Sequence, residues 1–228
     1  MNDRSNSNSN GGGLLAKLRC ALTFGRGVAR GLPELEAGTT PIALFHEWFD
    51  QARRAGILLP EAMAVATCTK DGAPSARMML LKGADERGFV FFTNHVSRKG
   101  SELATNPRAA LVFHWSVLQR QVRVEGDVEK LSEQASKEYF HSRPRGSQIS
   151  AWASPQSSPV PSRTALEDQV RQYEKQFDGA EVPLPPFWGG LLLVPQRIEF
   201  WQGRPNRLHD RLCCTRQEDG WEVERLAP

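Results

Sequence analysis

Arginine, lysine and histidine recur in short groups along this 228-residue chain, and the last group is the most regular. The run RPNRLHDRL, from Arg204 to Leu212, follows RIEFWQG, which is typical of a buried strand and a turn. Alternate residues of a strand share one face, roughly 7 Å apart. We therefore predict a row of Arg207, His209 and Arg211, with Leu208 and Leu212 pointing towards a core. Three such groups repel one another, so the row indicates an anionic ligand.

Two basic groups earlier in the chain have the character of a phosphate site. ARMMLLKG carries Arg77 and Lys82, and SRKG carries Arg98 and Lys99 in the predicted first turn of a short helix. A helix N-terminus offers unpaired N–H groups and the positive end of the helix dipole, which favour a bound phosphate. The alternative is a solvated basic turn, because short motifs match often by chance.

A third group combines a phenol, a guanidinium and a hydroxyl. Tyr139 and Arg143 are four residues apart and would share one face of a helix. Pro144 would end that helix, and Ser147 would cap the next one. Such a group could hold a second phosphate. The alternative is an arginine stacked on a tyrosine at the surface.

Three weaker signals come from a loop and two strands. The loop SPQSS offers Gln156 and Ser157, and Trp201 ends an apolar strand, where a core role is the alternative to a cofactor wall. Gln121 stands in a valine-rich strand. A buried amide needs partners, which a ring carrying carbonyl and N–H groups would supply.

Composition and the motifs that are lacking exclude several classes. The net charge of +3 is small for a nucleic-acid module. The sequence has no Ser-His-Asp order, no metal-ligand spacing and no G-x-G-x-x-G fingerprint, and no apolar run reaches transmembrane length. None of the four cysteines forms a CxxC pair, which favours free thiols in a reducing cytoplasm; they are Cys20, Cys68, Cys213 and Cys214.

Hydrophobic periodicity and capping residues predict the elements that must position these groups. We expect residues 1–38 to form a disordered tail and a flexible arm, and residues 39–228 to form one α+β domain, mainly β, built around a barrel. A helix should begin at Pro41, with Thr40 as its cap, and end at Gly56. Residues 62–94 should form three strands. The remaining helices are expected within 97–106, 132–144 and 163–177, and the remaining strands within 107–115, 120–131, 191–203, 207–217 and 220–228.

An ordered set of segments resembles the pyridoxamine 5′-phosphate oxidase family from about residue 41 to the C-terminus. The segments are RMMLLKG, FVFFTN, SRKG, NPRAAL, RQVRVEG, YFHSRPRGSQISAWASPQSS, PPFWGG, RIEFWQG, RLHDR and RLAP. The resemblance implies an FMN-binding split β-barrel with peripheral helices, and a homodimer with two flavin sites at the subunit interface. It also implies oxidation of pyridoxine or pyridoxamine 5′-phosphate to pyridoxal 5′-phosphate, with O2 as acceptor and H2O2 as product.

The resemblance also implies a role for each matching residue. Arg207 and His209 would lie over the substrate ring and serve catalysis. The FMN contacts would be Arg77, Met78, Met79, Leu80, Leu81, Lys82, Phe92, Thr93, Arg98, Lys99, Gln121, Gln156, Ser157, Trp201 and Arg211. The substrate contacts would be Lys82, Tyr139, Arg143, Ser147, Arg207, Leu208 and His209.

This chain departs from the family pattern at one place, and two rival functions are open to it. Family members often carry Arg-x-x-Tyr in an arm over the substrate, where this chain has Ala21 and Phe24. One rival is a related flavin oxidase with another substrate, of the phenazine-pathway type. The other is a non-catalytic flavin- or haem-binding split barrel. The retained substrate residues disfavour both rivals.

Overall fold

The computed structural model describes Leu32 and residues 40–228. Its contacts divide the chain into two compact units. The first contains the segments up to Pro60, Phe113–Arg123 and Ile198–Pro228; the second contains Glu61–Val112 and Val124–Arg197. Except for Leu32, the predicted tail and arm, including Ala21 and Phe24, lie outside the described residues. The single domain expected over 39–228 stays a prediction.

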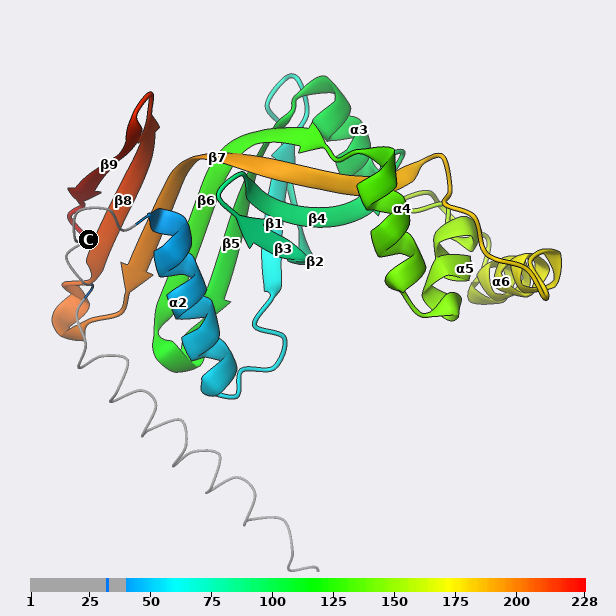
Figure 1. Cartoon of the computed structure of the whole chain (residues 1–228), viewed down its shortest axis with the longest axis horizontal. Coiled ribbons are helices and arrows are strands. Elements are labelled where there is room, and N and C mark those ends of the chain that lie inside the picture. The colour runs from blue at the N-terminus through cyan, green and yellow to red at the C-terminus, as the bar shows by residue number, and fades with distance from the viewer. Residues whose placement is uncertain (1–31, 33–39) are drawn as a thin grey trace, which may run out of the picture. The chain divides into compact units, whose positions relative to one another are not determined.

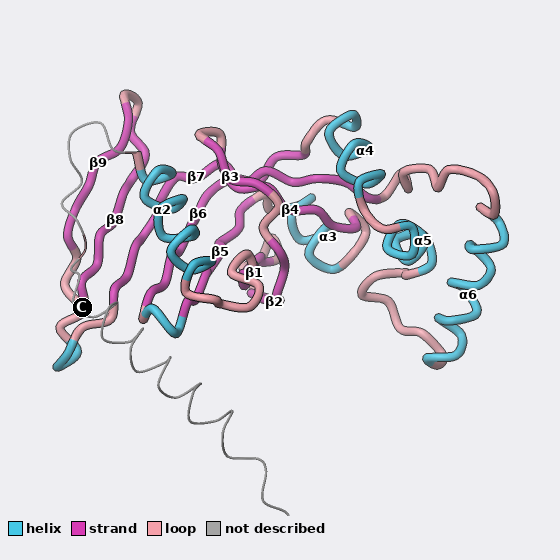
Figure 2. Tube along the Cα trace, turned by 60° about the horizontal axis from the view of Figure 1, so that its bottom comes forward, coloured by secondary structure: helices cyan, strands magenta, loops and turns pink. Residues whose placement is uncertain are grey.

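Helices and strands occur in the order shown in Figures 1 and 2. The helices are α2 (Pro41–Arg54), α3 (Arg98–Thr105), α4 (Glu133–Ser142), α5 (Arg145–Ala153) and α6 (Arg163–Gln176), with short 3-10 turns η1 (Ser116–Leu118) and η2 (Pro205–Arg207). The strands are β1 (Ala62–Cys68), β2 (Pro74–Leu80), β3 (Gly83–Asp85), β4 (Gly88–Asn94), β5 (Arg108–Trp115), β6 (Arg120–Lys130), β7 (Trp188–Gln202), β8 (Asp210–Gln217) and β9 (Gly220–Arg225).

In the first unit, α2 packs on the strand residues that belong to the same unit. The hydroxyl of Thr40 accepts from Ala43 N at 3.2 Å, which confirms the predicted cap. The apolar stripe of α2 is buried: the Phe45 ring lies 5.1 Å from that of Phe113 in β5, and the Trp48 ring 5.3 Å from that of Phe200 in β7. β8 pairs with β7 and β9 at the end of the chain.

In the second unit, the strands follow the order β2-β1-β5-β6-β7-β4-β3. β1 pairs with β2 and β5, and β4 with β3 and β7, all antiparallel. The sequence prediction of three strands over 62–94 is wrong, since four form there. Leu81 turns into the core after β2, and Lys82 N donates to Val90 O at 2.8 Å, so the chain re-enters the sheet as β3.

Helix α5 lies between α4 and α6 in the second unit (Figure 2). Side chains of these helices and of the segment after α6 form a small apolar core. Its buried members are Phe140, Ile149, Phe177 and Val182. Two local predictions are wrong here. Arg143 is the extended C-cap of α4 and lies beyond the helix, because a residue before proline avoids the helical conformation. Ser147 lies inside α5, whose N-cap position is Pro144.

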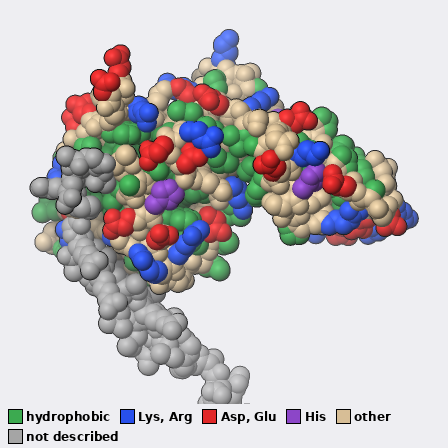
Figure 3. Space-filling model, viewed as in Figure 1, with side chains coloured by type: hydrophobic (Ala, Val, Ile, Leu, Met, Phe, Trp, Pro, Cys, Tyr) green, Lys and Arg blue, Asp and Glu red, His purple; other side chains and the backbone are tan. Residues whose placement is uncertain are grey.

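Several properties of the described residues bear on function. None of their helices has the length and apolar character needed to cross a bilayer. Within the same residues, no group of His, Cys, Asp and Glu is placed to hold a metal ion. Cys68, Cys213 and Cys214 are free thiols, whereas Cys20, the fourth cysteine of that prediction, lies outside the described residues. Acidic and basic side chains are interspersed on the described part of the face in Figure 3, which suits small ligands better than a polyanion.

We predict that Gly126→Ala destabilises the second unit. An added Cβ at Gly126 in β6 would lie 2.0 Å from Val194 O in β7, and the paired backbones cannot move apart without loss of their contacts. We expect about 1–3 kcal/mol loss in the free energy of unfolding, measured by urea denaturation. Gly146→Ala is the matched control, since nothing lies within 4 Å of that Cβ. Equal stabilities of the two variants would contradict the prediction.

Candidate active site

One pocket of the second unit is lined by most of the cofactor and substrate contacts that were predicted in that unit. It has a volume of about 430 Å³. It is lined by Arg77, Met78, Met79, Leu80, Lys82, Phe92, Thr93, Lys99, Tyr139, Arg143, Gln156 and Trp188. All but Trp188 were predicted as cofactor or substrate contacts.

One side of the pocket lies at the start of helix α3. Ser97 caps the helix by accepting from Gly100 N at 3.3 Å. A side chain at position 100 would bring its Cβ to 2.2 Å from His95 O, so the close fit of this first turn requires glycine. The turn therefore presents Lys99 and the N-terminal amides of α3 in one fixed place.

Lys99 is a buried cation held by neutral acceptors. Its Nζ donates to Thr93 Oγ1 at 2.9 Å, to Gln156 Oε1 at 2.8 Å and to Ser97 Oγ at 3.3 Å. Burial and the charge of Arg77 lower the pKa of Lys99 to about 8. An anion bound in the pocket would stabilise the charged form of Lys99 and so raise its pKa again.

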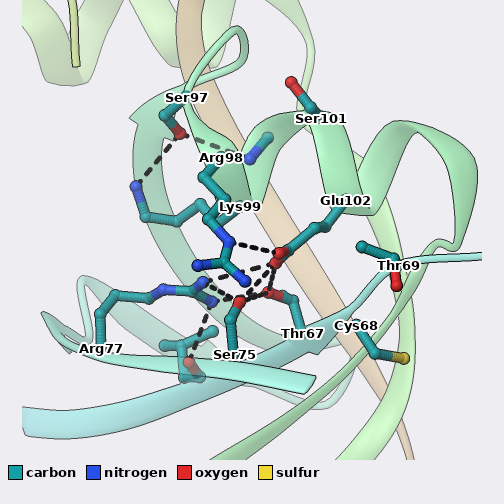
Figure 4. A network of polar contacts seen from close by, with 12 residues as sticks. Thr67, Cys68, Thr69, Ser75, Arg77, Ser97, Arg98, Lys99, Ser101 and Glu102 are labelled. Carbon is teal, nitrogen blue, oxygen red and sulfur yellow. Dashed lines mark hydrogen bonds and ion pairs between the residues drawn. The ribbon is translucent and has the colours of Figure 1, made fainter. Parts of the chain in front are cut away.

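Arg77 and Arg98 meet at Glu102, as Figure 4 shows. Arg98 Nε lies 2.9 Å from Glu102 Oε1, and Arg77 Nη2 lies 3.4 Å from Oε2. Arg77 Nη1 also donates to Thr67 Oγ1 at 2.6 Å. Two arginines from different elements therefore share one carboxylate beside the start of α3.

The other side of the pocket combines stacked rings with Arg143. Phe92 and Tyr139 stack at 3.8 Å between centroids, and Trp188 stacks on Phe92 at 5.4 Å. The Arg143 guanidinium lies 4.8 Å from the centre of the Trp188 ring. Its Nη2 donates to Ser147 O at 2.9 Å, whereas its buried Nη1 has no partner among the described residues. A buried donor of this kind indicates a place for an acceptor on a ligand.

Four predicted contacts of the second unit do not line this pocket. Leu81 is buried in the core, and Arg98 reaches Glu102. Ser147 contributes its carbonyl oxygen to Arg143. Ser157 lies in the loop after Gln156, where its φ is +73°.

The remaining predicted residues belong to the first unit, where the proposed strand row does not form. β8 begins only at Asp210, so Arg211 is on the strand while Arg207 ends the turn η2. Pro205 starts that turn, and Asn206 and Arg207 both have positive φ, at 58° and 59°. Leu208 is 70% exposed, so its predicted core position is wrong, whereas Leu212 is buried as expected.

His209 lies against Trp201, with ring centroids 4.7 Å apart. Its Nδ1 accepts from Arg204 N at 3.2 Å. In the neutral form the proton of His209 is therefore on Nε2, which makes that atom a hydrogen-bond donor. Gln121 is half-buried on β6 and alternates with the buried Val122, so it is not the fully buried amide that the sequence suggested.

Arg211 meets a protein anion. Its Nε and Nη2 lie 3.0 and 3.1 Å from the two oxygens of the buried Glu199. Arg123 Nη1 approaches the same carboxylate at 3.4 Å. The sequence indicated an anionic ligand for the predicted row. At Arg211 the anion is instead the side chain of Glu199.

Sequence reasoning missed Trp188 and Glu102. Trp188 belongs to PPFWGG, a segment that carried the resemblance without a role for its tryptophan. Glu102 follows Arg98 by four residues, which is the spacing of a helical ion pair and was a readable signal. Its contacts with Thr67, Ser75 and Arg77 join distant parts of the chain and have no signal in spacing.

Comparisons with known proteins identify the family of the chain. The family model for pyridoxamine 5′-phosphate oxidase matches residues 49–177, and the model for the pyridoxine 5′-phosphate oxidase C-terminal dimerisation region matches residues 188–228. The pyridoxine/pyridoxamine 5′-phosphate oxidase of Colwellia psychrerythraea is 56% identical, over 94% of this chain and 99% of the relative. The enzyme named pyridoxine/pyridoxamine 5′-phosphate oxidase 1 of Ralstonia nicotianae is 58% identical, over 82% and 89%.

Solved structures share the fold. PhzG from Burkholderia lata 383, in complex with tetrahydrophenazine-1-carboxylic acid, superposes with a TM-score of 0.83 at 31% identity, over 89% of this chain and all of that one. A pyridoxamine 5′-phosphate oxidase-related, FMN binding protein from Nostoc punctiforme gives 0.66 at 18% identity, over 84% and 99%. The fold class is the α+β split barrel that was predicted. On the family models and the relatives above 50% identity, the chain belongs to the pyridoxine/pyridoxamine 5′-phosphate oxidase family.

Proposed function

We propose that this protein uses FMN to oxidise pyridoxamine 5′-phosphate or pyridoxine 5′-phosphate to pyridoxal 5′-phosphate, with O2 as acceptor and H2O2 as product. The observation that carries the proposal is that one pocket is lined both by Lys99, beside the start of α3, and by Arg143, which lies over the Trp188 ring. Lys99 lies at the end beside α3, and Arg143 lies at the aromatic end. Two phosphorylated aromatic compounds, cofactor and substrate, fit such a pocket. The relatives named as oxidases of this kind support the same substrate class.

The end beside α3 fits the FMN phosphate. Lys99, Arg77 and Arg98 supply positive charge there, and the first turn of α3 supplies backbone N–H groups. Gln156 and Thr93 already accept from Lys99, so they can hold the ammonium towards a phosphate. We assign the other contacts of this cofactor to Met78, Met79, Leu80, Leu81, Lys82, Phe92, Ser157, Gln121, Trp201 and Arg211.

The aromatic end fits the substrate phosphate. The unpartnered Nη1 of Arg143 would donate to a phosphate oxygen, while Nη2 stays on Ser147 O. Lys82 Nζ lies 5.9 Å from the centre of the Tyr139 ring, so its charge and the phenol can join the same clamp. Ser147 completes the proposed set.

Arg207, Leu208 and His209 are assigned to the substrate ring. When bound, FMN supplies a two-electron acceptor that dioxygen can reoxidise. The substrate gives up a hydride and a proton; for the amine, water then replaces nitrogen and ammonia leaves. Because Arg204 N occupies Nδ1 of His209, the imidazole presents Nε2–H as a donor. His209 therefore orients an oxygen or nitrogen of the substrate, and Arg207 adds a positive charge beside it.

We also propose a homodimer with FMN at the subunit interface. Residues 188–228 match the dimerisation region of the family. On β2, Met78 is 67% exposed and Leu80 37% exposed, beside the pocket. Exposed apolar residues next to a ligand site suit a surface that a second subunit covers.

The rival is a flavin oxidase of the phenazine type, because PhzG shares the fold and 31% identity. Tyr139, Arg143 and Lys82, which would clamp a phosphate, favour the phosphorylated substrate.

Anaerobic spectroscopy of the FMN-loaded protein tests the function. We expect pyridoxine 5′-phosphate to bleach the flavin absorbance and air to restore it, since hydride transfer and reoxidation both follow from the proposal. Tetrahydrophenazine-1-carboxylic acid serves as the comparison substrate. A flavin bleached only by the phenazine would establish the rival, and a flavin bleached by neither would contradict the oxidase proposal.

Arg143→Ala should raise KM for pyridoxine 5′-phosphate by about 10- to 100-fold, because a hydrogen bond to a charged group is lost. Steady-state kinetics measures this effect, and fluorescence titration should show unchanged FMN affinity. Lys137→Ala, at an exposed lysine of α4, is the control. An FMN affinity that fell as much as KM rose would rule out the assignment of Arg143 to the substrate.

FMN affinity should fall as pH rises above 8. The pKa of Lys99 is lowered to about 8, so its positive charge is present below that pH and lost above it. A phosphate monoester is already doubly ionised there, so the loss approaches tenfold per pH unit for one proton. FMN titrations from pH 7 to 9.5 measure it. Lys99→Arg keeps its charge and should flatten the profile; a flat wild-type profile would contradict the prediction.

A further inference from the structure

Glu102 is a buried acid among the cations of the proposed phosphate site. Its side chain is 4% exposed. It accepts hydrogen bonds from Thr67 Oγ1, from Ser75 Oγ at 2.6 Å and from Arg98 Nε at 2.9 Å, with Arg77 Nη2 at 3.4 Å (Figure 4). The donors come from β1, β2 and α3, so one carboxylate joins three elements.

The carboxylate stays charged despite its burial. Burial alone would raise the pKa of Glu102, but the hydrogen bonds from Ser75, Thr67 and Arg98 and the charge of Arg77 outweigh it and lower the pKa to about 2. Glu102 is therefore an anion throughout the neutral range. It is a fixed counter-charge for the two arginines.

The contacts also fix where each guanidinium lies. Arg77 Nη1 donates to Val65 O at 3.2 Å and to Thr67 Oγ1, while Nη2 is held by Ser75 and Glu102. Arg98 is bound to Glu102 through Nε alone, and its side chain is 64% exposed. Without the carboxylate, Arg98 would lose its hydrogen bond to Glu102, and the like charges of the two arginines would drive them apart.

We propose that Glu102 is a positioning residue for the cofactor phosphate, which holds Arg77 and Arg98 in place before the phosphate binds. The inference rests on the proposed FMN site and names a residue that acts through the two arginines. Three cations and Glu102 leave a surplus of two positive charges at this end of the pocket. That surplus matches a phosphate monoester, which carries about −1.5 to −2.

The competing explanation is that Glu102 only fastens α3 to β1 and β2. In that case its removal would weaken every ligand of the pocket to the same degree, through the fold. A positioning role instead acts on the phosphate alone. Riboflavin has the ring and side chain of FMN without the phosphate, so the affinity ratio of the two flavins separates the explanations.

The experiment measures FMN and riboflavin dissociation constants by fluorescence titration of the full-length protein. We expect Glu102→Ala to weaken FMN binding by about tenfold or more, with riboflavin affinity within about twofold of wild type. Glu102→Gln keeps one acceptor oxygen for Arg98 but removes the counter-charge, so it should recover only part of the loss. Asp85→Ala is the matched control: it breaks an exposed carboxylate–arginine pair at 2.7 Å in the same unit, outside the pocket, and should change neither affinity.

Two results would overturn the inference while FMN binding itself stood: unchanged FMN affinity in Glu102→Ala, or a parallel loss of FMN and riboflavin. A wild-type protein that bound FMN no better than riboflavin would overturn the proposed cofactor site, and the inference with it.

Discussion

The proposed phosphate site of the second unit depends on one electrostatic constraint. Several cations must lie close together in the folded protein before any ligand binds. Arg77, Arg98 and Lys99 surround the start of α3, and each repels the others. The buried carboxylate of Glu102 offsets this repulsion for the two arginines. Lys99 donates to neutral oxygens, and its burial together with the charge of Arg77 lowers its pKa. The positive charge of the site is therefore only partly neutralised within the protein, so the site attracts an anionic ligand.

In the first unit, another buried glutamate also pairs with two arginines. Glu199 is as buried as Glu102, at 4% exposure, and it also holds two arginines, Arg123 and Arg211. Arg211 binds it through two nitrogens, a geometry that fixes the plane of the guanidinium. In both units, one buried glutamate is shared by two arginines whose own side chains are partly exposed. An arginine held this way keeps its orientation whether or not a ligand is present.

Periodic patterns and caps were readable from the sequence, whereas chain reversals and long-range contacts were not. α2 was predicted with its cap, since Thr40, Pro41 and the apolar stripe all act within a few residues. The Arg207–His209–Arg211 row was wrong because Pro205 and two residues with positive φ delay the strand to Asp210. Arg143 was placed on a helix that Pro144 already ends. Glu102 was missed because three of its four donors lie 25 to 35 residues away. The resemblance supplied site residues without the contacts that orient them.

The two ends of the pocket differ in how many guanidinium hydrogen-bond donors already have acceptors among the described residues. At the end beside α3, a carboxylate and several hydroxyls occupy the donors of Arg77, so a phosphate there meets groups that are already oriented. At the aromatic end, Arg143 lies over the face of Trp188, and its buried Nη1 has no hydrogen-bond partner in the part of the chain that the structure describes. A ligand that supplies the missing acceptor removes that cost, and the cost returns when the ligand leaves. Binding at the aromatic end therefore gains a hydrogen bond for Arg143, whereas binding beside α3 meets an Arg77 that needs no reorientation.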